Sequence, residues 1–195
     1  MFSLKQGRKL VELARLAIET SLSKKSIDFS DYEEFSEKQG VFVTLNTHGE
    51  LRGCIGFTEP VYELNRAIVE AARSAAFTDP RFPSVTKEEL DEIEIEVSAL
   101  TVPKLIEAEP EEYTDKIVIG RDGLIIRGMF GSGLLLPQVA TEQNWDEETF
   151  LRHTCMKAGL DEEAWKDSSN KLYIFQAQIF SEKSPKGEVV EKEIQ

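Results

Sequence analysis

Hydrophobic residues recur at helical spacing near the start of the chain. Leu10, Ala14 and Ile18 follow the segment Ser3-Leu4-Lys5-Gln6, which has the spacing of a capping box. In that motif a serine side chain and a glutamine side chain each bond the other residue's backbone N–H. The pattern predicts a helix over about residues 4–22.

Two runs rich in β-branched and aromatic residues come next. Gly40–Leu45 and Leu51–Phe57 are separated by Thr47–Glu50, a short turn segment that contains glycine. This arrangement predicts a β-hairpin. Pro60 then suits the first turn of a helix. The apolar positions of that helix fall on one face at Leu64, Ala67, Ile68, Ala71, Ala72 and Ala75.

The segment Asp79–Pro83 ends this helix, because two prolines in four residues prevent its continuation. Thr86–Glu89 has the spacing of a second capping box and predicts a short helix. From Ile93 to Ala99 apolar residues alternate with polar ones, which predicts a strand with one buried face.

The second half of the chain repeats this order. Lys116–Ile119 and Leu124–Ile126 flank Arg121-Asp122-Gly123, which predicts a hairpin around an Asp-Gly turn. The remaining elements are expected as a helix over Pro137–Gln143, a helix capped by Asp146 and ended by Gly159, and a strand over Tyr173–Ile179.

Both halves therefore follow the order hairpin, helix, helix, strand, which favours one α+β domain built from two similar units. We expect this domain to span residues 1–195. Its parts are an N-terminal helix (4–24), a first unit (40–102), a second unit (116–180) and a charged tail (181–195) whose end is loose.

Composition and charge exclude several classes of protein. Hydrophobic residues make up 41% and charged residues 30%, as in an ordinary globular protein. Thirty-six acidic residues against 23 basic ones give a net charge of −13, which opposes binding to nucleic acid or anionic lipid. No apolar run approaches 18 residues, and Met1–Gly7 lacks a signal-peptide core. We therefore expect a cytoplasmic protein with no membrane segment, a location that also suits a chain with only two cysteines.

The segment Leu51–Gly56 is the most informative for chemistry. Strand alternation places Arg52 and Cys54 on one face, with their side chains roughly 7 Å apart. A guanidinium at that distance can stabilise a thiolate, so Cys54 is a candidate nucleophile or redox thiol. The alternative is a small buried cysteine whose flanking glycines pack beneath a helix. The residues alone favour this alternative.

Metal and phosphate sites have little support. The chain has two histidines and two cysteines, and His48 at the hairpin tip lies roughly 15–20 Å along the strand from Cys54. His153 and Cys155 are two residues apart on a helix and do not share a face. Gly128–Gly133 matches neither nucleotide-binding motif and is expected to be a flexible bend between strand and helix. We expect no metal and no cofactor.

The run LRGCIG at Leu51–Gly56 resembles the signature of the AMMECR family, named after the Alport syndrome, midface hypoplasia and elliptocytosis chromosomal region. The resemblance extends from about Gly40 to Phe180 and implies an α+β fold with a duplicated strand-and-helix unit. We therefore expect the two units to share a mainly antiparallel, curved sheet. Further matching blocks are GVFVTL (40–45), DPRFPSV (79–85), EIEVSAL (94–100), GRDGLII (120–126), LLLPQVATEQNWD (134–146) and CMKAGL (155–160).

Carried over onto this sequence, the family motif marks Arg52, Gly53, Cys54, Gly56, Asp79, Arg81, Phe82, Pro137 and Gln138 as site residues. Structural roles remain open for some of them: Asp79 as a helix cap or turn residue, Arg81 as an ion-pair partner, and Gln138 as a partner for free backbone donors.

The resemblance implies no established reaction. It points to Memo-type proteins as partners and to a pathway shared with radical-SAM enzymes. Our first hypothesis is a binding or adaptor domain that uses the LRGCIG face to engage a protein or a small molecule. The alternative is an enzyme with Cys54 as nucleophile or redox thiol, in a modification pathway with those proteins.

Overall fold

The structure of the protein is a computed structural model that describes residues 1–129 and 131–193. The chain forms two compact units. The first comprises Met1–Leu100 together with Gln178–Lys192, and the second is built mainly from Thr101–Ala177.

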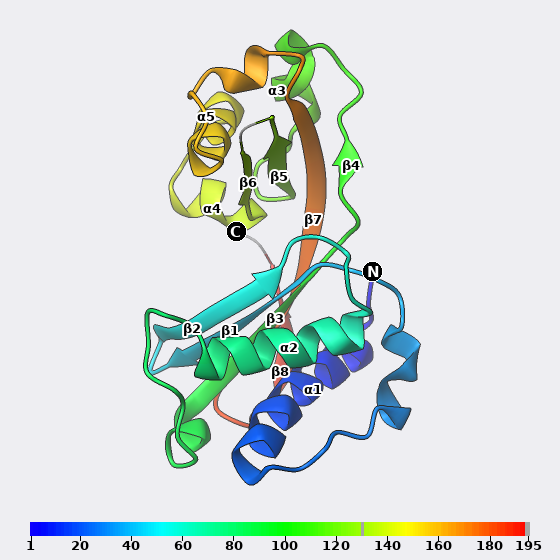
Figure 1. Ribbon diagram of the computed structural model, residues 1–195, viewed down its shortest axis with the longest axis vertical. Coiled ribbons are helices and arrows are strands. Elements are labelled where there is room, and N and C mark those ends of the chain that lie inside the picture. Colours follow the sequence, from blue (N-terminus) through cyan, green and yellow to red (C-terminus); the bar gives the residue numbers. More distant parts are fainter. Residues whose placement is uncertain (130, 194–195) are drawn as a thin grey trace. The chain divides into compact units, whose positions relative to one another are not determined.

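The first unit contains two long helices and an antiparallel sheet (Figure 1). Its helical elements are α1 (Leu4–Ser23), η1 (Ser30–Phe35), α2 (Leu64–Phe77) and η2 (Glu89–Glu92). Its strands are β1 (Val41–Thr47), β2 (Glu50–Phe57), β3 (Ile93–Leu100), the final residues of β7 (Lys171–Glu182) and β8 (Val189–Lys192).

Helices α1 and α2 lie side by side in Figure 1 and pack against each other and against the strands of this unit. The predicted capping box forms, since Ser3 and Gln6 bond each other's backbone N–H. The predicted apolar face of α2, represented by Leu64, Ile68 and Ala75, is buried in the core. The sequence periodicity therefore identified the layer that the helices form with the sheet.

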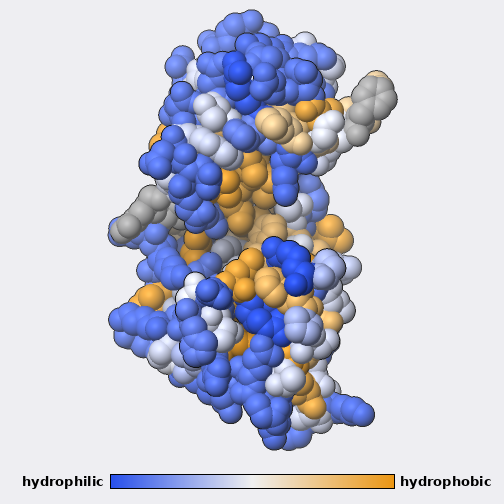
Figure 2. Space-filling model, turned by 90° about the vertical axis from the view of Figure 1, so that its left-hand side faces the viewer, coloured by the Kyte–Doolittle hydropathy of each residue, from blue (hydrophilic) through white to orange (hydrophobic). Residues whose placement is uncertain are grey.

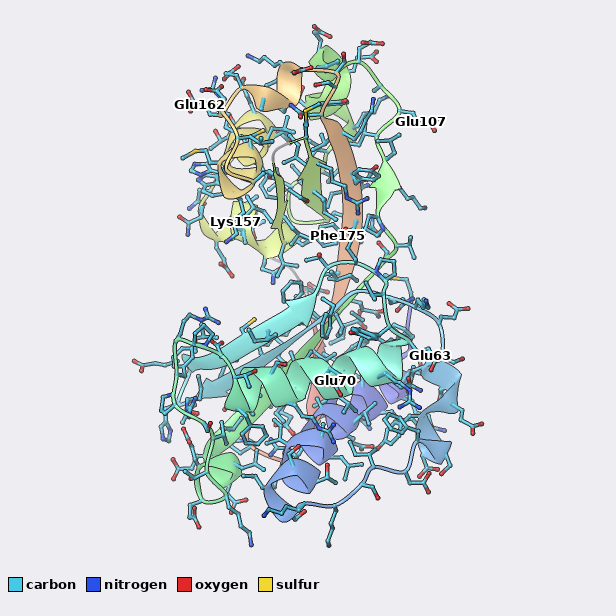
Figure 3. All side chains as sticks on the ribbon, in the orientation of Figure 1. Glu63, Glu70, Glu107, Lys157, Glu162 and Phe175 are labelled. Carbon is cyan, nitrogen blue, oxygen red and sulfur yellow. The ribbon has the colours of Figure 1, made fainter. Side chains whose placement is uncertain are left out.

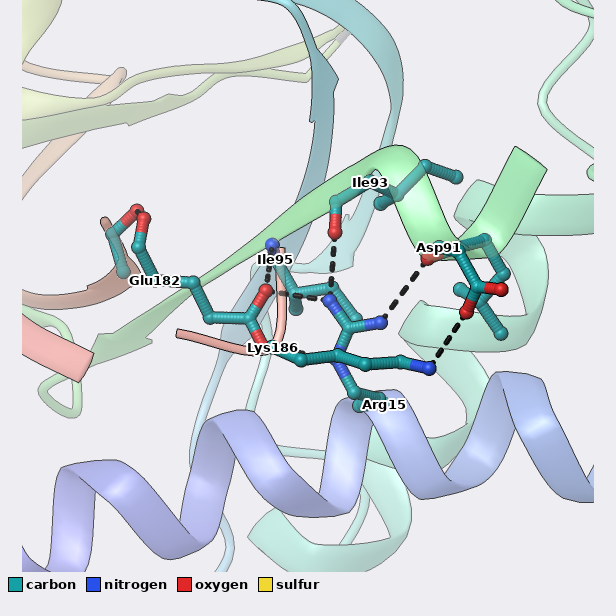
Figure 4. A network of polar contacts seen from close by, with 8 residues as sticks. Arg15, Asp91, Ile93, Ile95, Glu182 and Lys186 are labelled. Atoms are coloured by element: carbon teal, nitrogen blue, oxygen red, sulfur yellow. Dashed lines mark hydrogen bonds and ion pairs between the residues drawn. The ribbon is translucent and has the colours of Figure 1, made fainter. Parts of the chain in front are cut away.

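A buried ion pair joins α1 to the end of β7. The Arg15 guanidinium donates to both carboxylate oxygens of Glu182, at 2.9 and 2.5 Å, and to the backbone carbonyl of Ile93 at 2.7 Å. Glu182 in turn accepts the backbone N–H of Ile95 at 2.9 Å (Figure 4). Because both side chains are almost fully buried, each charge depends on the other for compensation.

The second unit also contains a hairpin, helices and a strand. Its elements are β4 (Lys104–Leu105), η3 (Pro110–Glu112), α3 (Tyr113–Lys116), β5 (Asp122–Arg127), β6 (Ser132–Leu135), α4 (Pro137–Glu142), α5 (Glu147–Lys157), η4 (Ala164–Lys166) and the first residues of β7. Phe150 and Leu151 of α5 pack with Leu124 and Leu172 in a separate core. Asp146 caps α5, as expected, by accepting the N–H of Thr149.

The hairpin of the second unit was predicted in the wrong place. Asp122 and Gly123 begin β5 instead of forming a turn. The Asp122 carboxylate is fully buried and accepts the backbone N–H of Val118, while a Cβ on Gly123 would lie 2.3 Å from the Phe175 ring. The burial of Asp122 and the close packing of Gly123 therefore explain why these two residue types occur at the start of a strand.

The turn of that hairpin comes between Arg127 and Ser132, inside the segment Gly128–Gly133 that was expected to be a bend between strand and helix. The backbone N–H of Gly128 donates to the carbonyl of Gly131 at 2.9 Å, and β6 follows directly. Phe130, within the predicted bend, lies outside the described residues.

Two other boundaries differ from the prediction. Helix α2 begins at Leu64, so Pro60 does not lie in its first turn. The charged tail contains β8, which pairs antiparallel with the end of β7. The pairing supplies hydrogen bonds that the tail's sequence pattern did not reveal. The last two residues of the tail, 194–195, lie outside the described residues.

The expected α+β class, antiparallel sheet and N-terminal helix are confirmed. The hydrogen-bonded strand order is β2-β1-β3-β7-β5-β6, and β4 and β8 also pair with β7. The pairings β1–β2, β1–β3, β4–β7, β5–β6, β5–β7 and β7–β8 are antiparallel. The face shown in Figure 2 carries many hydrophilic side chains, in keeping with the high fraction of charged residues.

Candidate functional site

The LRGCIG residues occupy β2, the first strand in the order of the sheet. Gly53 faces α2, where a Cβ would lie 2.3 Å from the backbone carbonyl oxygen of Ala75. Ile55 also packs on the helical core, so Cys54 lies on the opposite face of the strand. Glycine at position 53 thus allows the helix backbone to approach the strand directly.

Arg52 occupies an irregularity in the strand. The β1–β2 register shifts between Leu45, which pairs with Gly53, and Asn46, which pairs with Leu51, so Arg52 is the extra residue of a β-bulge. Its guanidinium forms a bidentate pair with Glu89 and donates to the carbonyl of Pro83 at 2.7 Å. Its side chain is only 11% exposed. The bulge and these partners direct Arg52 toward the η2 region.

Asp79 and Arg81 bind the backbone of Cys54. The buried Asp79 carboxylate accepts the N–H of Cys54 at 2.9 Å, and Arg81 donates to the carbonyl of Cys54 at 3.1 Å. Arg81 also donates to both carboxylate oxygens of Asp79, at 3.0 and 2.7 Å. Hydrogen bonds from Arg81 hold the pKa of Asp79 well below its usual range. We call this pair the Asp79–Arg81 clip.

The clip determines how Cys54 faces β1. Thr44 lies opposite Cys54 in the ladder, and the N–H and C=O of Cys54 point outward to the clip. Two opposed residues whose backbone groups do not bond each other have closely spaced side chains. The Thr44 hydroxyl accordingly donates to Cys54 Sγ at 3.3 Å. Glu96 lies opposite Thr44 on the other side, which completes a polar row across three strands.

The prediction that Arg52 stabilises a thiolate at Cys54 is wrong. Burial raises the pKa of the Cys54 thiol, and the hydrogen bond from Thr44 and the charge of Arg81 only partly oppose that effect. His48, the histidine of the first unit, pairs with Glu92 and not with the thiol. Cys54 is therefore a half-buried neutral thiol.

The Phe82 ring lies close to two guanidinium groups. Its ring centre is 5.8 Å from the Arg52 guanidinium carbon and 5.4 Å from that of Arg81. Both distances are within the range of cation–π contacts. Arg52 pairs with Glu89 and Arg81 pairs with Asp79, so the charges around the ring nearly cancel. We call Arg52, Arg81 and Phe82 the Phe82 platform.

The structure brings seven of the predicted residues together in the first unit, as the LRGCIG strand and the Asp79–Phe82 loop: Arg52, Gly53, Cys54, Gly56, Asp79, Arg81 and Phe82. Pro137 and Gln138 begin α4 in the second unit. The Gln138 side-chain oxygen is buried and has no hydrogen-bond partner among the described residues.

Sequence reasoning missed Glu89 and Thr44. The Thr86–Glu89 capping box does form, with the backbone N–H of Glu89 donating to the Thr86 hydroxyl at 3.2 Å. The carboxylate of Glu89 also binds Arg52. Only the strand register places Thr44 at Cys54, since ten residues separate the two in the sequence.

Within residues 1–129 and 131–193, no three His, Cys, Asp or Glu side chains gather in a way that could hold a metal ion. Over the same described range, no helix has both the length and the apolar character needed to cross a membrane.

Comparisons with known proteins agree over most of the chain. A family model described as AMMECR1 matches residues 11–180. Protein MJ0810 of Methanocaldococcus jannaschii is 52% identical over 198 residues, covering 100% of this chain and 98% of that protein. Protein PYRAB00100 of Pyrococcus abyssi is 52% identical over 196 residues, covering 96% of each chain.

A solved structure has the same fold. The crystal structure of the uncharacterized protein PH0010 from Pyrococcus horikoshii superposes with a TM-score of 0.88 at 50% sequence identity, covering 97% of each chain. Sequence and structure together show that this chain belongs to the AMMECR1 family.

Proposed function

We propose that this protein is a binding or adaptor domain that engages a protein partner or a small molecule through the Phe82 platform and the adjacent Cys54 strand. The observation that carries this proposal is the position of Phe82 beside two arginines, each anchored by its own carboxylate. An aromatic ring beside arginine, held in place before binding, is typical of residues that dominate binding energy.

The charges of the platform determine what kind of contact it makes. Glu89 and Asp79 neutralise the two guanidinium groups, so the platform does not attract anions strongly. Recognition would depend on stacking against Phe82 and on hydrogen bonds from the exposed part of Arg81. This kind of contact suits a protein segment or a flat small molecule.

The enzyme alternative has less support. A nucleophilic cysteine needs a thiolate at neutral pH, whereas burial raises the pKa of Cys54. Arg52, the residue expected to activate it, is paired with Glu89. Replacement of Cys54 by serine is therefore expected to weaken binding at most modestly and to abolish no reaction.

The proposal can be tested with a closely matched control. Arg81–Asp79 and Arg121–Asp122 are similar ion pairs: the arginine side chains are 51% and 52% exposed, and both aspartates are buried. We expect Phe82→Ala and Arg81→Ala to weaken partner binding by about tenfold or more, whereas Arg121→Ala leaves it unchanged.

The first probe is a Memo-type protein, the partner that the family resemblance implies, with affinity measured by calorimetry. Affinity capture from native lysate extends the search to other partners, with all three variants compared. Retention of every captured partner by Phe82→Ala and Arg81→Ala contradicts the proposal.

The two free thiols, Cys54 and Cys155, support the expected cytoplasmic location of such binding.

A further inference from the structure

Strand β4 of the second unit has one open edge. It pairs with β7, and no strand of the described chain lies on its other side (Figure 1). The segment around it is held at both ends, because the backbone N–H groups of Thr101 and Ile106 donate to carbonyls of β7 at 2.8 and 2.9 Å. The open edge therefore belongs to an ordered strand.

The strand register shows which backbone groups the open edge presents. The N–H of Ile106 bonds the carbonyl of Leu172 in β7, and Leu105 lies opposite Tyr173. Hydrogen-bonded and non-hydrogen-bonded pairs alternate along an antiparallel ladder, so the N–H and C=O of Leu105 point away from β7. Unpaired groups of this kind are a template for another strand. Pro103 has no N–H and limits such pairing to the part of the edge from Leu105 onward.

A small pocket adjoins this edge. Its volume is about 200 Å³, below the roughly 300–1,000 Å³ of typical small-molecule sites, so it suits a single side chain. Leu105, which is 42% exposed, lines the pocket at the edge of the strand. The buried side chains of Ile106, Pro110 and Tyr113 supply an apolar part of the wall. A segment that pairs with the edge can therefore insert one side chain with an apolar stem.

The charges at the pocket favour a cation. Glu107 and Glu109 line it and are exposed, and neither forms an ion pair in the part of the chain that the structure describes. Figure 3 labels Glu107, whose side chain projects away from β7. The pocket also contains Lys171, but its ammonium donates to the backbone carbonyl of Ser168 at 3.1 Å instead of to either carboxylate. Both carboxylates are therefore free to accept a cationic group.

The surroundings of the pocket are acidic as well. Residues 104–116 contain five acidic residues and two lysines, Lys104 and Lys116, which gives this stretch a net charge of −3. The whole chain carries −13. Complementary charge speeds association and selects partners, so this surface suits a basic partner.

We propose that the open edge of β4 binds an extended, arginine-containing segment of a partner protein. One residue of the segment exchanges backbone hydrogen bonds with Leu105, and a neighbouring arginine side chain enters the pocket. The stem of that arginine packs on the apolar wall, and its guanidinium, which has five N–H donors, bonds Glu107 and Glu109. Main-chain bonds combined with a side-chain pocket are typical of strand addition. The proposal is independent of the Phe82 platform, because every residue involved lies in the second unit.

The test is an NMR titration of the ¹⁵N-labelled full chain with the peptide acetyl-Gly-Thr-Val-Arg-Val-Thr-Gly-amide. We expect the largest shift changes at Leu105, Glu107 and Glu109. Hydrogen exchange measures the edge directly: in the free chain the Leu105 amide should exchange faster than the bonded Ile106 amide. With peptide at about ten times its Kd, exchange at Leu105 should slow by about tenfold.

Two double variants separate the pocket from the general negative charge. Glu107→Lys/Glu109→Lys should lose about tenfold or more in peptide affinity at an ionic strength of about 0.15 M. The matched control is Glu111→Lys/Glu112→Lys, the same charge change at two exposed glutamates that do not line the pocket. It should lose less than about threefold.

Altered peptides keep the result decisive even if a variant folds poorly. Citrulline in place of arginine removes the charge, and N-methylation of the three central amides removes backbone donors; each should lower affinity about tenfold. Four outcomes overturn the proposal: no shifts at β4 with about 1 mM peptide, no protection of the Leu105 amide, equal affinity of either altered peptide, or equal losses in the two double variants. Binding of acetyl-arginine-amide as tight as that of the peptide would also overturn strand addition and assign the pocket to a small guanidinium compound.

Discussion

The Asp79 carboxylate accepts the backbone N–H of Cys54 at 2.9 Å, on the outer edge of β2 where another strand's carbonyl would otherwise bond. Arg81 completes the arrangement by donating to the Cys54 carbonyl. Exposed strand edges invite unwanted pairing, and natural proteins protect them with charged groups. The clip therefore protects the strand edge and also fixes the position of the Cys54 side chain.

Replacement of Asp79 should destabilise the first unit. Asp79→Ala leaves the Cys54 N–H without its acceptor and removes the carboxylate from Arg81, so we expect a loss of about 2–3 kcal/mol in the free energy of unfolding. Asp79→Asn keeps one acceptor oxygen and should lose less. Urea denaturation measures both values, and wild-type stability of Asp79→Ala would show that the clip contributes little.

The clip also predicts a pH dependence. The pKa of Asp79 is lower in the folded protein than in the unfolded chain, where it is about 3.9. The resulting stabilisation is fully present above the unfolded pKa and decreases as the pH falls toward the folded pKa. Between about pH 5 and pH 2 the wild type should lose more stability than Asp79→Asn. Parallel acid-unfolding curves for the two proteins would contradict this.

The two thiols should differ in reactivity. Cys54 is half-buried, whereas Cys155 is fully buried and its pKa is raised to about 11 by that burial. Iodoacetamide near neutral pH should therefore label Cys54 first. Arg81→Ala should slow that labelling because the charge of Arg81 favours the thiolate, whereas Arg52→Ala should not. Mass spectrometry of labelled peptides follows both sites, and faster labelling of Cys155 would contradict the assignment.

The buried pair between Arg15 and Glu182 should be essential for stability. Glu182→Ala leaves the Arg15 guanidinium buried without its counter-charge, so we expect a loss of about 3–5 kcal/mol in the free energy of unfolding. Lys186→Ala, which removes the exposed Lys186–Asp91 pair shown in Figure 4, is the control and should change stability far less. Equal effects of the two changes in urea denaturation would contradict this role for the pair.

Nucleic acid should not bind at moderate salt. The chain carries a net charge of −13, and the first thirty residues, its basic part, hold only six Lys/Arg against three Asp/Glu. Association with DNA or RNA relies on clustered cations that release counterions. A filter-binding assay with duplex DNA and structured RNA checks this, and salt-sensitive micromolar retention would implicate α1.

Local patterns predicted most of the secondary structure. The Ser3–Gln6 capping box, the apolar face of α2 and the alternation of β3 each involve residues close in the chain. Such patterns act within a single element, so they can be recognised without knowing its neighbours. The hairpin around Asp122 was misplaced because its Asp-Gly pair satisfies buried contacts with Val118 and Phe175 instead of forming a turn.

The candidate site was only partly predictable. The LRGCIG motif located the strand and Asp79–Phe82 the loop, but alternation suggested that Arg52 would act on Cys54. A one-residue bulge and the position of Glu89 changed that outcome. The sequence by itself determined which residues form helices and strands and which family signature they carry. The tertiary structure decided the partners of Arg52 and of the Cys54 backbone N–H, because these groups are satisfied by Glu89 and Asp79, 37 and 25 positions away.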